Sequence, residues 1–311
     1  PLVSSSAASD VYKRQLPLQL GYSSSGEVVQ TGKGVSDFHT GDRVVSNGNH
    51  AEYVVVNQNL CTRIPENTDI KEASFTVLGS IALHGLRLSE TSLGSKVVVI
   101  GLGIIGQLVC RLAEAQGSEV IGIDPDTKRT DMSANFYTSV EEANMTNVDS
   151  VIITAATSSN EPIEVATKIA RNKAKIVVVG DIPLNISRND FYYKELELVV
   201  SKSYGPGRYD KQYEILGKDY PIEYVRWTEN RNFEAFIKLL SQNQIHLLDL
   251  VTEEVSFENA PSIYKKFSGE DKPLSIVLRY DNKSEPKIDL QRTVELEPKT
   301  ETINLGILGL S

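Results

Sequence analysis

The clearest pattern of apolar residues begins at residue 97, where the β-branched run Val97–Ile100 meets the glycine turn Gly101–Gly106. Apolar residues then recur at helical spacing, and Gly117 follows the last of them; they are Ile105, Leu108, Val109 and Leu112. The pattern predicts a buried strand, a tight turn and an amphipathic helix. A G-x-G-x-x-G motif is informative only in this context.

Each glycine of the turn has a separate purpose in a dinucleotide-binding unit. Gly101 permits the tight turn, Gly103 leaves the backbone open to a pyrophosphate, and Gly106 lets the helix pack close to its strand. The helix N-terminus adds free N–H groups and the positive end of its dipole. The residues that we expect to bind the cofactor here are Gly101, Leu102, Gly103, Ile104, Ile105 and Gly106.

A second predicted strand, residues 119–123, ends at Asp124. This is the place of the acid that accepts hydrogen bonds from the ribose of NAD. The same carboxylate repels the additional phosphate of NADP, so we expect NAD to be preferred. The simpler alternative is an aspartate that only terminates a strand, because Asp124-Pro125-Asp126 is also typical of a turn.

Strand and helix patterns continue to alternate after this unit. They cover residues 151–156 (strand), 162–170 (helix), 176–180 (strand) and 196–201 (strand). Such alternation predicts an α/β fold with a doubly wound parallel sheet, whose ligands lie at the carboxyl ends of the strands. Thr154, Gly180 and Asp181 are therefore expected to face the cofactor, although each could merely end a strand.

The chain before residue 95 has a different pattern. Short β runs alternate with glycine turns over residues 21–29, 31–35, 38–45 and 50–56, and they predict a compact antiparallel β unit. Residues 70–88 then follow a helical pattern. Three short motifs stand out in the β unit: Gly26-Glu27-Val28-Val29, Gly41-Asp42-Arg43-Val44 and Ala51-Glu52-Tyr53-Val54.

With these motifs, the glycine turn and Asp124, residues 16–280 resemble the medium-chain dehydrogenase/reductase superfamily, specifically its alcohol and polyol dehydrogenases. The resemblance implies a GroES-like catalytic domain, a Rossmann domain, and a cleft between them for nicotinamide and substrate. The boundaries we expect are 1–15 (an adaptor-like tail), 16–85 (part of the GroES-like domain), 86–230 (Rossmann), 231–281 (return to the catalytic domain), 282–301 (linker) and 302–311 (start of a second nucleotide-binding domain).

The loops Ser203–Tyr209 and Tyr224–Asn230, and the glycine turn near residue 306, resemble a subgroup of two-domain oxidoreductases. In these proteins the dehydrogenase unit is fused to a glucose–fructose oxidoreductase/inositol dehydrogenase type domain, and they are typically found with polysaccharide-biosynthesis genes. Arg208 in the first loop is a candidate to hold a phosphate or carboxylate of cofactor or substrate. The alternative for Arg208 is a surface residue with a local partner.

Many members of the family that the chain resembles bind a catalytic zinc ion. Their His-Glu pair corresponds here to Tyr22-Ser23, and residues 76–80 contain no Cys, Asp or Glu. The first ligand would precede residue 16, so we expect no zinc. The polar residues that we expect near the cleft, as catalytic candidates in place of zinc, are Tyr22, Ser23, His50 and Ser80. Of these, only a histidine normally titrates near neutral pH. The alternative for His50 is an ordinary loop histidine.

Charge and cysteine content narrow the class of protein. The chain has 32 Lys and Arg against 41 Asp and Glu, a net charge of −9, which argues against nucleic acid or an anionic membrane as the main partner. No apolar stretch approaches the ~20 residues that a membrane span needs. The two cysteines fit a cytoplasmic location. Cys110 is expected to pack, and Cys61 is either structural or a lone catalytic thiol.

The main hypothesis is an NAD(H)-dependent oxidoreductase that transfers hydride to or from an alcohol, polyol or sugar-like small molecule, without zinc. One alternative is a non-catalytic NAD-binding half of a fused oxidoreductase. Another is a zinc-free NADPH-dependent quinone reductase, for which Lys128 and Arg129 could reach a 2′-phosphate. The sequence leaves open the substrate, the direction of reaction and the oligomeric state, a homo-oligomer included.

Overall fold

The computed structural model describes residues 20–266 and 272–280, which belong to one compact unit. The tail expected at residues 1–15, the linker at 282–301 and the second glycine turn at 302–311 lie outside the described residues. Within the described part of the chain, no helix is long and apolar enough to cross a membrane.

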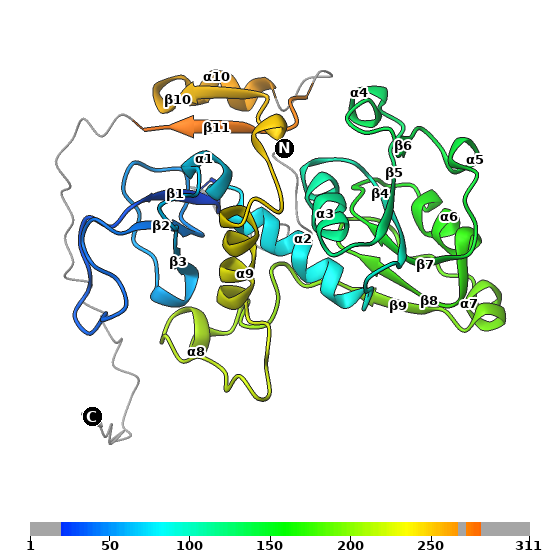
Figure 1. Cartoon of the computed structure of the whole chain (residues 1–311), viewed down its shortest axis with the longest axis horizontal. Helices are drawn as coiled ribbons and strands as arrows, with labels where there is room; N and C mark the ends of the chain where they lie inside the picture. The colour runs from blue at the N-terminus through cyan, green and yellow to red at the C-terminus, as the bar shows by residue number, and fades with distance from the viewer. Residues whose placement is uncertain (1–19, 267–271, 281–311) are drawn as a thin grey trace, which may run out of the picture. The chain divides into compact units, whose positions relative to one another are not determined.

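A six-stranded parallel sheet forms the larger part of the structure, and its strand order is β6-β5-β4-β7-β8-β9 (Figure 1). This order confirms the predicted doubly wound sheet. Its strands are β4 (Lys96–Ile100), β5 (Glu119–Ile123), β6 (Phe136–Tyr137), β7 (Val148–Ile153), β8 (Ala170–Val178) and β9 (Glu197–Val200). The helices between them are α3 (Ile104–Ala115), α4 (Thr127–Thr130), α5 (Val140–Ala143), α6 (Glu161–Ile169) and α7 (Arg188–Lys194).

The apolar run of β4 is continuous because both faces of this central strand are covered. Val97 and Val99 belong to the core that also contains the buried residues of α3, whereas Val98 and Ile100 belong to the core that contains those of α6. Alternate side chains of one strand thus enter two cores, as expected for a parallel sheet with helices on both faces.

The amino-terminal part contains a three-stranded antiparallel sheet with strands β1 (Ser24–Glu27), β2 (Arg43–Ser46) and β3 (Cys61–Arg63). The predicted antiparallel unit is therefore confirmed, but the strand expected at residues 50–56 is wrong. Val55 is 76% exposed, whereas Cys61 and Thr62 are buried against β2. Burial against a neighbour, rather than β-branched composition, decided which segment became the third strand.

The helical pattern at residues 70–88 forms two helices, α1 (Ile70–Ala73) and α2 (Thr76–Leu88). Asp69 caps α1 by accepting from the N–H groups of Lys71 and Glu72. Helix α2 packs closely on α9 (Glu229–Ser241): a Cβ on Gly79 would lie 2.1 Å from the ring of Phe236. The absence of a side chain at residue 79 therefore sets the distance between these two helices.

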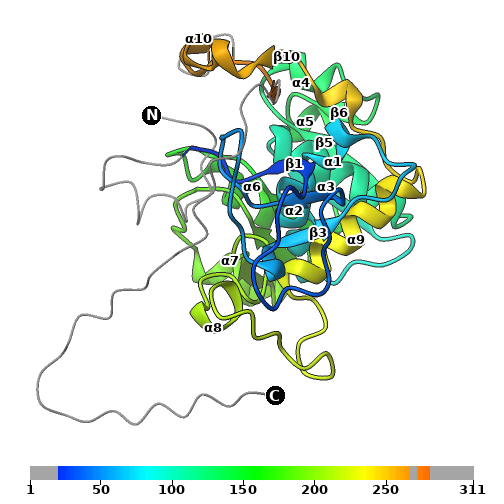
Figure 2. The same cartoon turned by 90° about the vertical axis from the view of Figure 1, so that its left-hand side faces the viewer.

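The carboxyl-terminal part returns to the antiparallel sheet through α9 (Figure 2). Asn230 donates from its side-chain amide to the carbonyl groups of Asn59 at 3.0 Å and Cys61 at 2.9 Å. The remaining elements are η2 (Gln58–Leu60), α8 (Lys211–Glu214), η3 (Leu248–Leu250), β10 (Glu253–Ser256), η4 (Phe257–Asn259), α10 (Ala260–Lys266) and β11 (Ile276–Arg279). Strands β10 and β11 pair in parallel and form a separate two-stranded sheet.

Trp227, the single tryptophan of the chain, lies between two arginine side chains rather than in one of the apolar cores. It is only partly buried, and the guanidinium carbons of Arg87 and Arg226 lie 3.4 Å and 3.8 Å from its ring centroid. Two guanidinium groups this close to one centroid must occupy opposite faces of the indole. The single tryptophan is therefore held by cation–π contacts rather than by a core.

Candidate cofactor and substrate site

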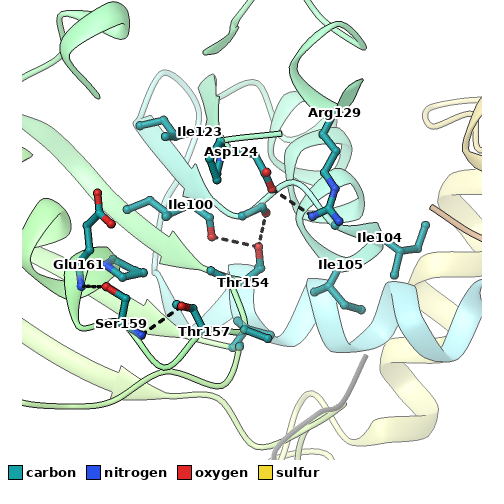
Figure 3. A pocket seen from close by; sticks show the side chains of 18 of the residues that line it. Ile100, Ile104, Ile105, Ile123, Asp124, Arg129, Thr154, Thr157, Ser159 and Glu161 are labelled. Carbon is teal, nitrogen blue, oxygen red and sulfur yellow. Dashed lines mark hydrogen bonds and ion pairs between the residues drawn. The ribbon is translucent and has the colours of Figure 1, made fainter. Parts of the chain in front are cut away.

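A cavity of about 910 Å³ lies at the carboxyl ends of the central strands. Figure 3 shows part of its lining, which comes from the ends of β4 and β5, the segment that follows β7, and helices α3, α4 and α6. Tyr22 and Ile81, from the amino-terminal part, line the same cavity. The predicted site residues found in the lining are Tyr22, Gly101, Gly103, Ile104, Ile105, Asp124, Thr154 and Gly180.

The glycine turn has the geometry that a bound pyrophosphate requires. Gly101 has φ +98°, and a Cβ there would lie 2.6 Å from the backbone nitrogen of Ala155. A Cβ on Gly106 would lie 1.9 Å from the carbonyl oxygen of Gly101, so only glycine fits this packing. A Cβ on Gly103 would meet nothing closer than a guanidinium nitrogen of Arg129 at 3.8 Å. The first and third glycines are thus needed by the fold, and the second faces open space.

Helix α3 begins directly after Gly103, which caps it without any side-chain hydrogen bond. The first N–H groups of a helix have no intrahelical acceptor and favour an anion. The residues present therefore fit a dinucleotide.

Asp124, at the end of β5, is 5% exposed and accepts three hydrogen bonds. Its Oδ2 accepts from the N–H of Leu102 at 2.7 Å and from Arg129 Nη1 at 3.2 Å; its Oδ1 accepts from the N–H of Asp126 at 2.9 Å. The Nε of Arg129 also lies 3.3 Å from Asp126 Oδ2 (Figure 3 shows the Asp124–Arg129 contact). Two carboxylates thus contact one guanidinium, and these three side chains together carry one net negative charge.

Thr154 supports the turn from β7. Its hydroxyl donates to the carbonyl groups of Gly101 at 2.5 Å and Ile100 at 3.3 Å. Gly180 approaches the neighbouring strand so closely that a Cβ would lie 2.0 Å from Ala155 O. Leu102, Gly106 and Asp181 do not line the cavity, and their roles in cofactor binding stay predictions.

One stretch of the cavity wall is apolar except for a phenol. Ile81, Ile105 and Val179 line it together with Tyr22. Burial raises the pKa of the Tyr22 hydroxyl, while the Arg208 cation acts in the opposite direction. Tyr22 is therefore protonated at neutral pH and can donate a hydrogen bond.

The other three polar candidates have partners elsewhere. Ser23 donates to Ser74 O at 2.6 Å, and Ser80, fully buried, donates to Thr76 O at 2.8 Å. The Nδ1 atom of His50 forms a hydrogen bond with the Tyr264 hydroxyl, and burial lowers the pKa of His50. None of the three lines the cavity, and their catalytic roles stay predictions.

Sequence reasoning missed Tyr204 and Glu229, which lie beside Arg208. Arg208 does not line the cavity; its Nη1 lies 2.6 Å from Glu214 Oε1, and its guanidinium carbon lies 5.0 Å from the ring centroid of Tyr204. Glu229 is fully buried, and burial together with the nearby Glu214 raises its pKa to about 9, opposed by Arg208 and Lys202. An isolated acid at the start of a helix carries no sequence signal for such burial.

The described residues offer no donor set for zinc: within residues 20–266 and 272–280 there is no group of three or more His, Cys, Asp or Glu side chains that could hold a metal ion. The two positions that correspond to the His-Glu pair of zinc-binding relatives hold Tyr22 and Ser23. The Ser23 hydroxyl already donates to a carbonyl group. Cys61 is buried in β3, and burial raises the pKa of its thiol to about 12.

Comparison with known proteins connects both parts of the structure with dehydrogenases. Residues 4–66 match the model of the alcohol dehydrogenase GroES-like domain, and residues 76–189 match that of the D-isomer specific 2-hydroxyacid dehydrogenase NAD-binding domain. D-guloside 3-dehydrogenase from Escherichia coli K12 is 26% identical over 272 residues, which cover 80% of this chain and 73% of that protein.

Solved structures of dehydrogenases share the fold. Galactitol-1-phosphate dehydrogenase from Escherichia coli superposes with a TM-score of 0.71 at 21% identity, covering 88% of this chain and 90% of the other. A Sinorhizobium meliloti 1021 protein classed as a zinc-binding dehydrogenase and bound to NADP has a TM-score of 0.67 at 20% identity, covering 85% and 84%. With a GroES-like part, a Rossmann part and these relatives, the chain is similar to alcohol and polyol dehydrogenases of the medium-chain dehydrogenase/reductase type.

Proposed function

We propose that this protein is a dehydrogenase that uses a nicotinamide dinucleotide, NAD(H) in preference, to interconvert an alcohol group of a polyol or sugar-like molecule and the corresponding carbonyl group. The observation that carries the proposal is the composition of one cavity. It joins the glycine turn and Asp124, which suit a dinucleotide, to Tyr22 and an apolar wall, which suit the reacting end. The named dehydrogenase relatives support the same class of reaction.

The preference for NAD(H) follows from the charges around Asp124. Asp124 and Asp126 together contribute two negative charges against the one positive charge of Arg129. A 2′-phosphate would have to displace a carboxylate from that guanidinium, and the two carboxylates would repel it. The ribose hydroxyls of NAD only need an acceptor, which Asp124 provides.

The nicotinamide supplies or accepts the hydride when the cofactor is bound. Ile81, Ile105 and Val179 would shield that exchange from water, because their side chains form the apolar stretch of the lining. Tyr22, protonated because burial raises its pKa, would donate to the substrate oxygen: in reduction it gives the proton that the new alcohol needs. No step is assigned to a metal ion, since the described residues contain no donor set for one.

Substitution of Tyr22 by Phe tests the proposal on the intact chain. We expect the variant to bind NADH as tightly as the parent but to lose at least about a hundredfold in kcat with polyols and the matching ketoses. Tyr193, which is 79% exposed, provides the matched control, and Tyr193→Phe should be fully active. An unchanged kcat in Tyr22→Phe would eliminate this tyrosine as the acid.

The presence of Tyr22 and Ser23 at the positions expected for zinc ligands favours a second candidate, a unit that binds NAD(H) without catalysis within a larger fused oxidoreductase. Substrate-dependent absorbance changes of NADH separate the two. If NADH binds but a panel of sugars, polyols and ketoses causes no oxidation or reduction, the non-catalytic function replaces the first.

A further inference from the structure

The cavity has a second apolar end, separate from the proposed reacting end. Ile123 and Val140 are buried in the core that contains the buried residues of α6, and Val165 of α6 packs against that core. All three side chains line the cavity, together with Pro162. At the proposed reacting end, Ile81 belongs to a different cluster. The cavity therefore extends from one apolar core to another.

The glycine turn connects the two ends. Ile100, directly before the turn, belongs to the same core as Ile123, whereas Ile105, on α3 after the turn, packs against the cluster of Ile81. Asp124 directly follows Ile123 in the chain. A dinucleotide with its pyrophosphate on the turn and a ribose at Asp124 would therefore place the base of that ribose in the end lined by Ile123. The flat face of a purine suits such an apolar wall.

One carboxylate reaches this end without a protein partner. Glu161 lines the cavity from the first turn of α6, directly before Pro162. Among the described residues, no hydrogen bond or ion pair holds the Glu161 carboxylate, although its N–H is bonded. Glu141, which also lines the cavity, forms an ion pair with Lys168 at 3.2 Å. Glu161 is thus the acid at this end that remains available to a ligand.

The backbone that carries Glu161 is held in place by side chains of the preceding turn. Thr157 Oγ1 accepts from the N–H of Ser159 at 3.1 Å, and Ser159 Oγ accepts from the N–H of Glu161 at 3.1 Å (Figure 3). The side chain of Asn160 accepts from the N–H of Asn185 at 3.1 Å. The Ser159 hydroxyl, which lines the cavity, keeps its own hydrogen and can donate it to a ring nitrogen.

The charge at the start of α6 disfavours a phosphate in this end of the cavity. Glu161 and Glu164 both lie in the first turn of the helix, where negative side chains already interact with the positive end of its dipole. A further anion would meet two carboxylates. A neutral group with an N–H donor is therefore the better match for this end.

We propose that Glu161 selects the base of the dinucleotide, by accepting a hydrogen bond from the 6-amino group of adenine. This inference rests on the dinucleotide binding proposed above. A carboxylate only accepts hydrogen bonds, and the amino group of adenine only donates them. A base that carries a carbonyl oxygen at the same position, such as hypoxanthine or guanine, would bring one acceptor against another and would leave the carboxylate unpaired.

The test titrates the full chain with NADH and with reduced nicotinamide hypoxanthine dinucleotide, which carries a carbonyl oxygen in place of the 6-amino group. Nicotinamide fluorescence reports both ligands in the same way. We expect the parent to bind NADH at least about tenfold more tightly than the hypoxanthine analogue. In Glu161→Gln this preference should fall to about threefold or less, because a carboxamide can accept from an amino group or donate to a carbonyl group. Glu161→Ala, which removes the acceptor, should lose the preference in the same way.

Glu164→Gln is the matched control. It removes the same charge from the same turn of α6, keeps an acceptor for the side-chain amide of Asn160, and does not line the cavity. Its ratio of the two dissociation constants should equal that of the parent, and Tm measurements on all variants confirm that they are folded.

Three results would overturn the role of Glu161 and leave the dinucleotide site intact. They are equal binding of both ligands by the parent, an unchanged ratio in Glu161→Gln and Glu161→Ala, and an equal loss of the preference in Glu164→Gln. Failure of the parent to bind either dinucleotide would instead refute the proposed function, and the inference with it.

Discussion

The glycine turn provides a pair of substitutions in which the same added methyl group has opposite consequences. A Cβ at residue 106 would lie 1.9 Å from the carbonyl oxygen of Gly101 and 2.9 Å from Thr154 Oγ1. The nearest atom is backbone, so neither a rotamer change nor a small shift of a flexible chain can remove the overlap. Helix α3 would have to move away from β4, which would disturb the packing of a strand with four buried residues.

Overpacking that the backbone cannot accommodate costs about 3 kcal/mol or more. For a chain of this size we expect Gly106→Ala to lower Tm by about 6–12 °C. Gly103→Ala should behave in the opposite way. Gly103 has φ −64° and ψ −177°, which alanine adopts readily, and its added Cβ would meet nothing within 3.7 Å. This variant should keep the parent's Tm to within about 2 °C.

Cofactor binding separates the two variants. The Cβ of Gly103→Ala would occupy the open space where the pyrophosphate is proposed to approach the backbone, so NADH affinity should fall at least about tenfold. Urea unfolding, thermal unfolding and NADH fluorescence titration on both variants check the pair. The reasoning is refuted if Gly106→Ala unfolds like the parent, or if Gly103→Ala retains full NADH affinity in a folded chain.

Three further predictions follow from individual groups. Asp124→Ala should weaken NADH binding relative to NADPH binding, because it removes the acceptor for the ribose hydroxyls and frees Arg129. Titrations with both cofactors measure the ratio of the two dissociation constants, and an unchanged ratio would contradict the prediction. Burial raises the pKa of Glu229 to about 9, so its carboxyl group resists ionisation in the folded state. The contribution of Glu229 to the free energy of unfolding is therefore full below pH ~4.5 and is lost as the pH rises toward 9. Urea unfolding at pH 5, 7 and 9 should therefore show the advantage of Glu229→Gln over the parent growing with pH, and a constant difference would contradict this. Cys61 and Cys110 are buried, and burial raises the pKa of both thiols. Iodoacetamide should therefore label neither cysteine in the native protein at pH 8 and both in urea. Rapid labelling of Cys61 in the native protein would show that its thiol is accessible and would contradict the prediction.

The parallel sheet could be predicted from the sequence because its signals are local. The apolar run Val97–Ile100 predicts a buried strand, and the glycine turn predicts that the following helix packs close to it; neither signal depends on distant residues. The third strand of the antiparallel sheet could not be predicted in the same way. Tyr53–Val56 has the better β composition, yet Cys61–Arg63 pairs with β2, since pairing depends on which segment the rest of the chain brings to that edge.

Candidate side chains show the same division between local and long-range information. Asp124 was identifiable by its distance from the turn, but its hydrogen bonds with Leu102 and Arg129 depend on the folded loop. His50 was selected as a titrating group, and its partner Tyr264 lies 214 positions away in the chain. No sequence spacing reports such a contact.

The two halves of the proposed site also differ in what kind of evidence identifies them. The dinucleotide half depends on backbone geometry, so glycines mark it in the sequence. The proposed substrate half depends on a desolvated side chain: burial raises the pKa of the Tyr22 hydroxyl, which lines the cavity. A phenol on an exposed loop would have water as a partner and would lack this shift. We therefore expect burial of Tyr22, rather than any sequence motif around it, to mark the reacting end, and comparison of kcat and Tm in Tyr22→Phe is the direct way to test this.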